Sequence, residues 1–378
     1  MASSSSMDEA SSQPRELREI CYVDFVTGLT SDFCGKVTFV ETNMKERLVA
    51  VGFSYGFLRI IRFRVTKEDK KKWKPFNQLI CCDKMARAVW SENDQKLITM
   101  SDRGTLVVYA CQQDGRWKKT KEMSWNLDSI SPSIIDNRIA ILDNDNCLMF
   151  GDPMGDRMGT VHHGDGPQIT CFDWGAHGEL IYGHENGEVK VVNTGETIDD
   201  PVRHRRTLKT GIHHKVVSIQ YWRAQKGPDE ESRPRLAIAY KNGRIQIRKD
   251  VSKKSIHDEC HNFEPMFMRW SPDGHSIAIV ALAKHLKPPS NTSVYFFSSK
   301  GERLGRFRFL NLHNIRGLSW CPSGCMVHVA GDRRVKLLRI EPFYSGEDTP
   351  EQDPSESESL LEGTGERIGN MFMRIFNF

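Results

Sequence analysis

The sequence lacks the segments that carry a protein to or across a membrane. The N-terminus, MASSSSMDEASSQ, has no apolar core of the kind that a secretory signal needs. The longest apolar run, residues 277–283, spans seven residues, whereas a membrane-spanning helix needs about 20. We therefore expect a cytoplasmic chain whose ten scattered cysteines are reduced and pack as small apolar groups.

Motifs of enzymes and cofactor sites are also missing. No serine–histidine–aspartate or paired-carboxylate pattern stands out, and the glycines at 363, 365 and 369 lack the strand and the Lys-Ser/Thr ending of a phosphate loop. Cys321 and Cys325 have a zinc-like spacing and His328 follows, but no matching second pair is nearby. We expect no catalytic residue, no cofactor, no metal and no small-molecule substrate.

The charge is nearly balanced overall but unevenly distributed. Lys plus Arg is 53 and Asp plus Glu is 49, a net charge of +4. Residues 345–378 contain eight acidic and two basic residues, which gives −6 and leaves +10 for residues 1–344. This distribution favours acidic partners for the body of the chain.

A repeat of about 40–50 residues organises the chain. Short apolar strands end on tryptophan at five places, with intervals of 84, 48, 48 and 50 residues: Trp90, Trp174, Trp222, Trp270 and Trp320. Tight turns with Asn-Gly at 186–187 and 242–243 indicate hairpins. With units lacking tryptophan at 36–65 and 133–152, the pattern predicts an all-β fold, a single seven-bladed WD40-type β-propeller.

The repeats depart from the standard pattern because no Trp-Asp dipeptide occurs. We therefore expect blades held by apolar packing and hairpin turns rather than by a buried polar network. The predicted organisation is a disordered Ser-rich N-terminus at 1–16, the propeller at 17–344, an acidic linker at 345–363 and an amphipathic C-terminal segment at 364–378.

Basic residues are densest between positions 59 and 74. We place three arginines in the last strand of the first blade and three lysines in the loop after it: Arg59, Arg62, Arg64, Lys70, Lys71 and Lys72. The segment is either a solvated outer strand or a contact for an acidic protein face or anionic lipid headgroups. Nucleic-acid binding is not favoured, because the aromatic residues here are not interleaved for base stacking.

The C-terminal segment carries an apolar stripe at helical spacing: Ile368, Met371, Phe372, Ile375 and Phe376. These positions correspond to i, i+3, i+4, i+7 and i+8 on one helix face. So short a helix needs a surface on which to fold. That surface is the propeller itself, another subunit or a membrane interface.

Five stretches stand out for their similarity to a known propeller: QKLITMSDRGTLVVYACQQDGRW (95–117), QITCFDWGAHGELIYGHENGEVKVVN (168–193), LAIAYKNGRIQIRK (236–249), SVYFFSSKGERLGRFRF (293–309) and NIRGLSW (314–320). They resemble the N-terminal propeller of the 121-kDa subunit of the intraflagellar transport A complex, and the WD region of WD-repeat tubby-like proteins. The resemblance covers about residues 75–341, and the Gly-Glu-x-Leu-Gly at 301–305 is its most telling part.

The resemblance implies a non-catalytic protein-interaction scaffold in ciliary retrograde transport and ciliary protein trafficking. The implied partners are other subunits of an intraflagellar transport complex, with a weak anionic membrane contact in addition. The implied location is the cytoplasm, the cilium and the ciliary base. The alternative is a substrate receptor of the ubiquitin-ligase type, or a generic WD40 adaptor, outside cilia.

Overall fold

The structure is a computed structural model of the 378-residue chain. It describes residues 35–43, 48–62, 77–91, 95–101, 105–124, 132–135, 138–143, 145–151, 158–162, 166–195, 203–223, 235–251, 254–284, 292–308, 315–322, 324, 326–331 and 335–339. Within these ranges no helix has the length and apolar character needed to span a bilayer.

The first three sheets each have four strands. Blade 1 contains β1 (Val37–Thr42), β2 (Leu48–Phe53), β3 (Phe57–Arg62) and β4 (Asn77–Cys81). Blade 2 contains β5 (Met85–Trp90), β6 (Lys96–Ser101), β7 (Thr105–Cys111) and β8 (Trp117–Ser124). Blade 3 contains β9 (Pro132–Ile135), β10 (Arg138–Leu142), β11 (Leu148–Gly151) and β12 (Met158–His162).

Three further four-stranded sheets and a smaller one follow. Blade 4 contains β13 (Ile169–Trp174), the 3-10 helix η2 (Ala176–Gly178), β14 (Glu179–His184), β15 (Val189–Asn193) and β16 (Arg203–Leu208). Blade 5 contains β17 (Val216–Trp222), β18 (Arg235–Tyr240), β19 (Arg244–Arg248) and β20 (Ser255–Cys260). Blade 6 contains β21 (Phe263–Trp270), β22 (Ser276–Ala283), β23 (Thr292–Ser298) and β24 (Arg303–Arg308). The three-stranded sheet contains β25 (Gly317–Trp320), β26 (Met326–Ala330) and β27 (Val335–Arg339).

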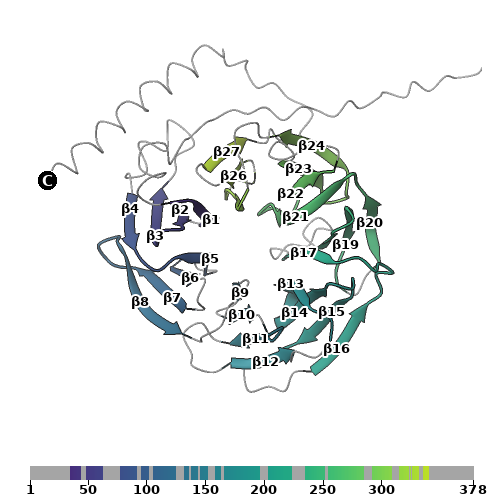
Figure 1. Ribbon diagram of the computed structural model, residues 1–378, viewed down its shortest axis with the longest axis horizontal. Helices are drawn as coiled ribbons and strands as arrows, with labels where there is room; N and C mark the ends of the chain where they lie inside the picture. The colour runs from purple at the N-terminus through teal and green to yellow at the C-terminus, as the bar shows by residue number, and fades with distance from the viewer. Residues whose placement is uncertain are drawn as a thin grey trace, which may run out of the picture.

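The sheets form the ring of an all-β propeller (Figure 1). Their first strands contact one another in the order β1, β5, β9, β13, β17, β21, β25 and back to β1. The expectation of seven four-stranded blades needs correction, because six complete blades are present and the sheet between blade 6 and blade 1 has three strands in the described residues. Closing the ring gives every sheet two neighbours and covers its faces.

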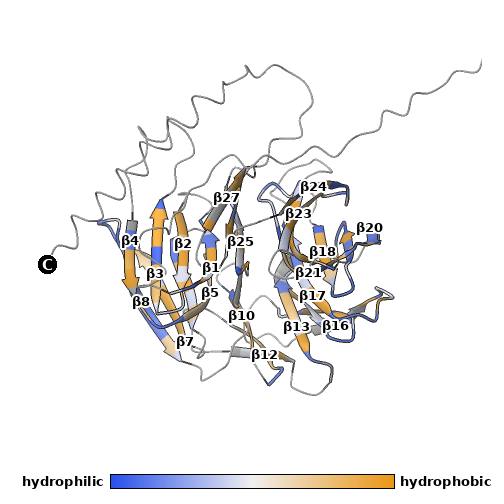
Figure 2. Cartoon of the chain, turned by 45° about the horizontal axis from the view of Figure 1, so that its top comes forward, coloured by the Kyte–Doolittle hydropathy of each residue, from blue (hydrophilic) through white to orange (hydrophobic). Residues whose placement is uncertain are grey.

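The second strand of each sheet shows why the ring has to close. All six residues of β2 and all five of β26 are buried, and β14 and β18 are buried except for their first residues. A strand that is buried on both faces reads as a continuous apolar run rather than an alternating one. Figure 2 shows β2 mainly in orange, the colour of hydrophobic residues.

The predicted Asn-Gly hairpins are confirmed at both positions. One connects β14 with β15 and the other connects β18 with β19. Gly187 and Gly243 have φ angles of +92° and +98°, a region that glycine occupies without strain. The side-chain oxygens of Asn186 and Asn242 each accept the backbone N–H two residues later, at 3.0 Å.

Tryptophans at the ends of the first strands connect neighbouring sheets. The indole N–H of Trp90 donates to the Glu41 carbonyl of blade 1 at 3.1 Å. Trp270 donates to the Gln220 carbonyl of blade 5 at 3.1 Å, and Trp320 donates to the carbonyl of Arg269 in blade 6 at 3.0 Å. Each of these bonds joins a first strand to the first strand of the preceding blade, across 49 to 51 residues of sequence.

Trp222 departs from this pattern. Trp90, Trp174, Trp270 and Trp320 each pair with the second residue of the next strand, whereas in β17 it is Tyr221 that pairs with the second residue, Leu236. Trp222 is one position later, so its side chain turns to the other face of the sheet. Its indole N–H donates forward to the Pro272 carbonyl of blade 6 at 3.0 Å. The sequence repeat placed Trp222 in register with the others, and the structure corrects this by one residue.

A histidine is buried at the join between blade 1 and the three-stranded sheet. Nδ1 of His328 lies 3.3 Å from Oγ1 of Thr42 and 3.6 Å from Sγ of Cys321. The Ser319 hydroxyl accepts the Thr42 backbone N–H at 2.8 Å. Burial lowers the pKa of His328 to about 3, so the ring is neutral at physiological pH. Two of the residues weighed for zinc, Cys321 and His328, therefore meet at this join, while Cys325 lies outside the described residues.

We predict that Trp320→Phe destabilises the propeller by roughly 1–3 kcal/mol, because the Arg269 carbonyl loses its donor while the aromatic ring is retained. Trp117→Phe is the matched control. Trp117 is 2% exposed, and its indole makes no hydrogen bond among the described residues. Urea denaturation followed by circular dichroism measures both variants. Equal losses of stability in the two variants would show that the indole hydrogen bond contributes nothing beyond ring volume.

Candidate functional site in the central channel

The first strands enclose a channel along the propeller axis with a volume of about 160 Å³. Its lining carries four charged side chains from four different sheets. Glu41 is on β1, Arg87 on β5 and Arg269 on β21, and Arg316 directly precedes β25. These residues lie far apart in the sequence, so only the closed ring brings their charges together.

One ion pair in the channel joins β21 to β1. Nη2 of Arg269 lies 3.6 Å from Oε1 of Glu41. Burial raises the pKa of the Glu41 carboxyl, and the positive charges of Arg269 and Arg87 oppose this rise. The backbone carbonyls of Glu41 and Arg269 also accept the Trp90 and Trp320 indoles. The channel charges and the contacts between sheets therefore share the same strand positions.

Arg87 makes no hydrogen bond or ion pair with the other described residues, and its side chain is exposed to the channel space. The surrounding protein partly desolvates its guanidinium, and this burial lowers its pKa. The like charge of Arg269 lowers the pKa further, and Glu41 acts in the opposite direction. Among the described lining residues, three arginines and one glutamate give a net charge of +2. Such a channel favours a carboxylate or another anion.

Asp173 belongs to the wall rather than to the lining. Its carboxylate accepts the Tyr221 backbone N–H at 2.8 Å and the Trp174 backbone N–H at 3.0 Å. Burial raises its pKa, and these two hydrogen bonds together with Arg269 and Arg223 act against the rise. Asp173 thus connects blade 4 to blade 5 at the position where other sheets use an indole.

The described lining offers no activated nucleophile. Cys171 is the channel thiol, and burial raises its pKa to about 12. A catalytic cysteine needs a lowered pKa, because the thiolate is the reactive species. Its neighbour Thr170 donates to the Val216 carbonyl and so ties blade 4 to blade 5. The arrangement can bind charged groups but does not prepare Cys171 for covalent chemistry.

The structure places part of the predicted basic segment. Arg59 lies in the middle of β3 and is 7% exposed, and Arg62 ends the same strand, half-buried. The expectation that these arginines lie in the last strand of the blade was wrong, because β4 pairs with β3 and forms the outer edge. Arg64, Lys70, Lys71 and Lys72 lie outside the described residues.

The apolar C-terminal stripe lies outside the described residues as well. This applies to all five of its positions: Ile368, Met371, Phe372, Ile375 and Phe376. The proposed binding role of this segment therefore stays a prediction.

The sequence analysis did not predict the charged residues that line the channel. The signal that could have found them is a charged residue within an apolar strand just before its terminal tryptophan, as at Arg269. Glu41 has no tryptophan beside it. Its pairing with Arg269 joins strands 228 positions apart, a separation that no local pattern reveals.

Comparison with solved structures identifies the architecture. The Cps50 (Swd1) β-propeller domain from Myceliophteria thermophila matches with a TM-score of 0.61 at 12% identity, covering 81% of this chain and 96% of that domain. A chain of the mitotic checkpoint complex matches with a TM-score of 0.60 at 13% identity, covering 90% of this chain and 97% of that chain. The fold is that of a WD-repeat propeller.

The sequence comparison also finds WD-repeat proteins. The human WD repeat-containing protein 35 is 22% identical over 330 residues, and the rat protein is 24% identical over 331 residues. Each alignment covers 82% of this chain and 27% of the relative, so the chain spans about a quarter of the length of these relatives. No family model matches the chain.

We predict that Arg269→Met destabilises the protein at pH 7.5 by roughly 1–3 kcal/mol. This is less than for a fully buried pair, because the Arg269 side chain is 36% exposed. Without Arg269, the folded-state pKa values of Glu41 and Asp173 rise further above their unfolded values. A raised pKa costs stability once the pH exceeds the unfolded value, so the deficit should shrink as the pH falls toward 4.5.

Thermal melts at pH 7.5 and 4.5 measure this difference, with Arg269→Lys as the control that keeps the positive charge. A deficit in Arg269→Met that is the same at both pH values would contradict the electrostatic role of Arg269.

Proposed function

We propose that this protein is a non-catalytic interaction scaffold that acts as an intraflagellar transport A-like component in ciliary retrograde transport and ciliary protein trafficking. The observation that carries the proposal is the alignment with WD repeat-containing protein 35, which extends over most of the propeller. The ciliary part of the proposal is supported by the resemblance of four segments to a transport-complex propeller, residues 95–117, 168–193, 236–249 and 293–320.

The mechanism is recognition by a rigid ring. The closed ring of blades holds the loops and the channel mouth in fixed positions. Binding a partner therefore costs little conformational entropy in these segments. The net positive channel suits an acidic side chain or an acidic chain end of a partner subunit. An unactivated Cys171 thiol is consistent with a binding role rather than a catalytic one.

Two further contacts belong to the proposal. Arg62, Arg64 and Lys70–Lys72 would meet an acidic subunit face or, more weakly, anionic lipid headgroups. The apolar stripe of residues 368–376 would fold against a groove of a neighbouring subunit. Both contacts would act at the ciliary base and along the cilium.

The test is affinity purification of the tagged full chain from ciliated cells, combined with imaging of the same cells. We expect co-purification of intraflagellar transport A subunits and signal at the ciliary base and axoneme. Recovery of elongin and cullin proteins instead would support a ubiquitin-ligase adaptor. A diffuse signal with neither set of partners would contradict the ciliary role.

Matched variants separate the contacts. Arg87→Glu reverses a channel charge, and Arg116→Glu makes the same change on the exposed β7–β8 hairpin. Phe372→Asp disrupts the apolar stripe, and Asn377→Asp adds the same charge beside it. We expect at least a several-fold loss of recovered partner for Arg87→Glu or Phe372→Asp, and little change for their controls.

A further inference from the structure

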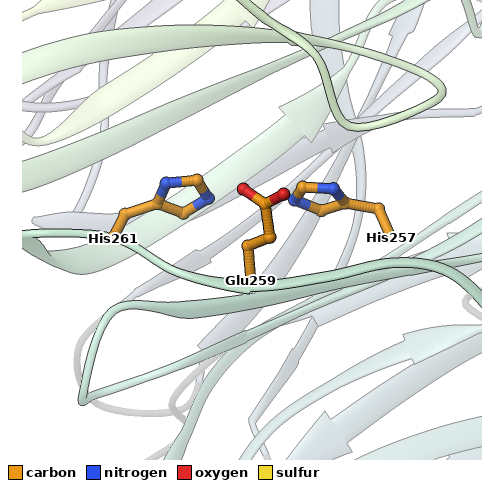
Figure 3. A group of neighbouring side chains, drawn as sticks. All are labelled: His257, Glu259 and His261. Atoms are coloured by element: carbon orange, nitrogen blue, oxygen red, sulfur yellow. The ribbon is translucent and has the colours of Figure 1, made fainter.

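The outer edge of blade 5 carries three metal-ligating side chains in a row. His257 and Glu259 lie on β20 and His261 directly follows it, so the three alternate with residues of the opposite face. One potential ligand atom from each lies within 4.8 Å of the others. Figure 3 shows the Glu259 carboxylate between the two imidazole rings. Such a two-histidine, one-carboxylate set is typical of zinc and other divalent transition-metal sites.

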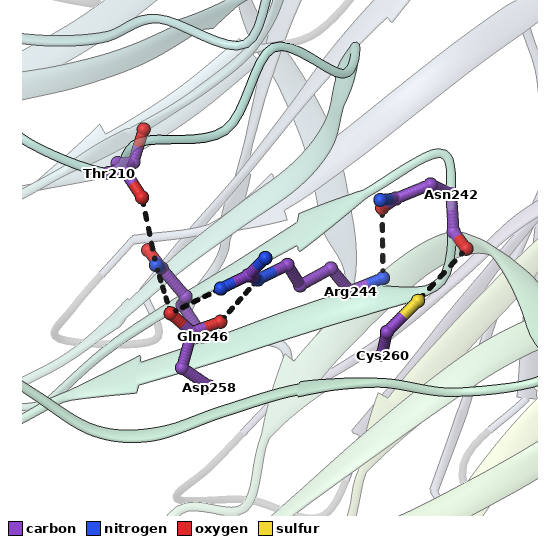
Figure 4. Close-up of polar contacts among 6 residues, drawn as sticks. All are labelled: Thr210, Asn242, Arg244, Gln246, Asp258 and Cys260. Atoms are coloured by element: carbon purple, nitrogen blue, oxygen red, sulfur yellow. Dashed lines mark hydrogen bonds and ion pairs between the residues drawn. The ribbon is translucent and has the colours of Figure 1, made fainter.

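The opposite face of β20 is fastened by an ion pair. Asp258 accepts Nε of Arg244 at 2.5 Å, Nη2 of Arg244 at 3.0 Å and Nε2 of Gln246 at 2.9 Å. Gln246 also reaches the Thr210 carbonyl in the connection after β16, at 3.5 Å. Figure 4 shows this network on the β19–β20 pair. Because Asp258 is held from the other side, the orientation of His257, Glu259 and His261 is fixed by the strand.

Both imidazoles present a buried, unpartnered nitrogen. Nε2 of His257 and Nε2 of His261 are buried and have no hydrogen-bond partner among the described residues. A buried polar atom without a partner costs free energy unless something binds it. A metal ion would accept a lone pair from each nitrogen at once.

Blade 6 forms the wall behind the two rings. Gly301, in the β23–β24 hairpin, lies so close to His257 that a Cβ at that position would clash with the imidazole ring. The His261 ring stacks on the Phe263 ring, with the ring centroids 5.2 Å apart, and its centroid lies 5.0 Å from that of Phe297. These contacts restrict the rings, and preorganised ligands favour binding.

The local charge is compatible with a cation. The Glu259 carboxylate supplies a negative charge between the two imidazole rings. The nearby Arg303 guanidinium lies over the Tyr295 ring, with its central carbon 5.2 Å from the ring centroid.

We propose that His257, Glu259 and His261 bind one zinc ion, or a similar divalent transition metal, at the outer edge of blade 5. The two imidazoles and the carboxylate supply three ligands, and water or a group from a partner completes the coordination. Zinc–nitrogen distances are about 2.0–2.1 Å, so the side chains must close slightly, and the exposed Glu259 can move to do so. We expected no metal site from the sequence. This inference does not depend on the proposed function.

The test is zinc titration of the chelator-treated full chain by isothermal calorimetry, with cobalt(II) absorption as a second readout. We expect one equivalent of zinc, and loss of affinity by more than about 100-fold in His257→Ala and in His261→Ala, since even loss of an outer-shell partner costs 10–100-fold. Glu259→Gln should weaken binding while the fold is retained. Cobalt(II) should give the visible absorption of a four- or five-coordinate site in the wild-type chain, and this absorption should be lost in His257→Ala and in His261→Ala.

His213→Ala and His214→Ala are matched controls, because both imidazoles are exposed and lie outside the cluster. They should bind zinc as the wild type does. The proposal is overturned if the wild-type chain binds no stoichiometric zinc, or if the controls lose as much affinity as the cluster variants. Circular dichroism of each variant distinguishes a lost ligand from a lost fold.

Discussion

The structure depends on the contact between neighbouring sheets around the ring. Second strands such as β2 and β26 are buried on both faces, so no sheet can satisfy its apolar surface without the sheets beside it. The indoles of Trp90, Trp270 and Trp320 add a directed hydrogen bond to this packing, each to the preceding first strand. Packing supplies most of the stability, and the indole bonds fix how the sheets are aligned.

Because apolar packing holds the ring together, polar residues on the central channel and on the outer edge of the blades are available for binding. On the inner margin, Glu41, Arg87 and Arg269 give the channel a charge that only ring closure assembles. On the outer margin, β20 uses one face to fasten itself through Asp258 and the other face to present His257, Glu259 and His261. In both places a strand already fixed by its neighbours positions the functional atoms.

The sequence predicted what local patterns encode. Strands ending on tryptophan, Asn-Gly hairpins and the repeat length were enough to identify a propeller. The position of Trp222 was wrong because a one-residue shift within β17 keeps the spacing but changes the face. The prediction that Arg59 lies in the last strand of blade 1 was wrong, because the repeat gave no sign of β4. That strand pairs with β3 on its outer side.

The number of complete blades and the two charged sites could not be predicted in this way. Glu41 and Arg269 meet only when the ring closes. The alternation of His257, Glu259 and His261 was visible in the sequence, but its meaning depends on knowing that these residues lie on one strand. Two unpartnered nitrogens against blade 6 appear only in three dimensions.

If the sheets depend on one another, they should unfold together as one ring. Native-state hydrogen exchange measures the opening free energy of each strand separately. We expect the amides of β2, β14, β18, β22 and β26 to share one opening free energy, equal to that of global unfolding. Separate opening of the three-stranded sheet, well below the global value and with the other blades still protected, would contradict it.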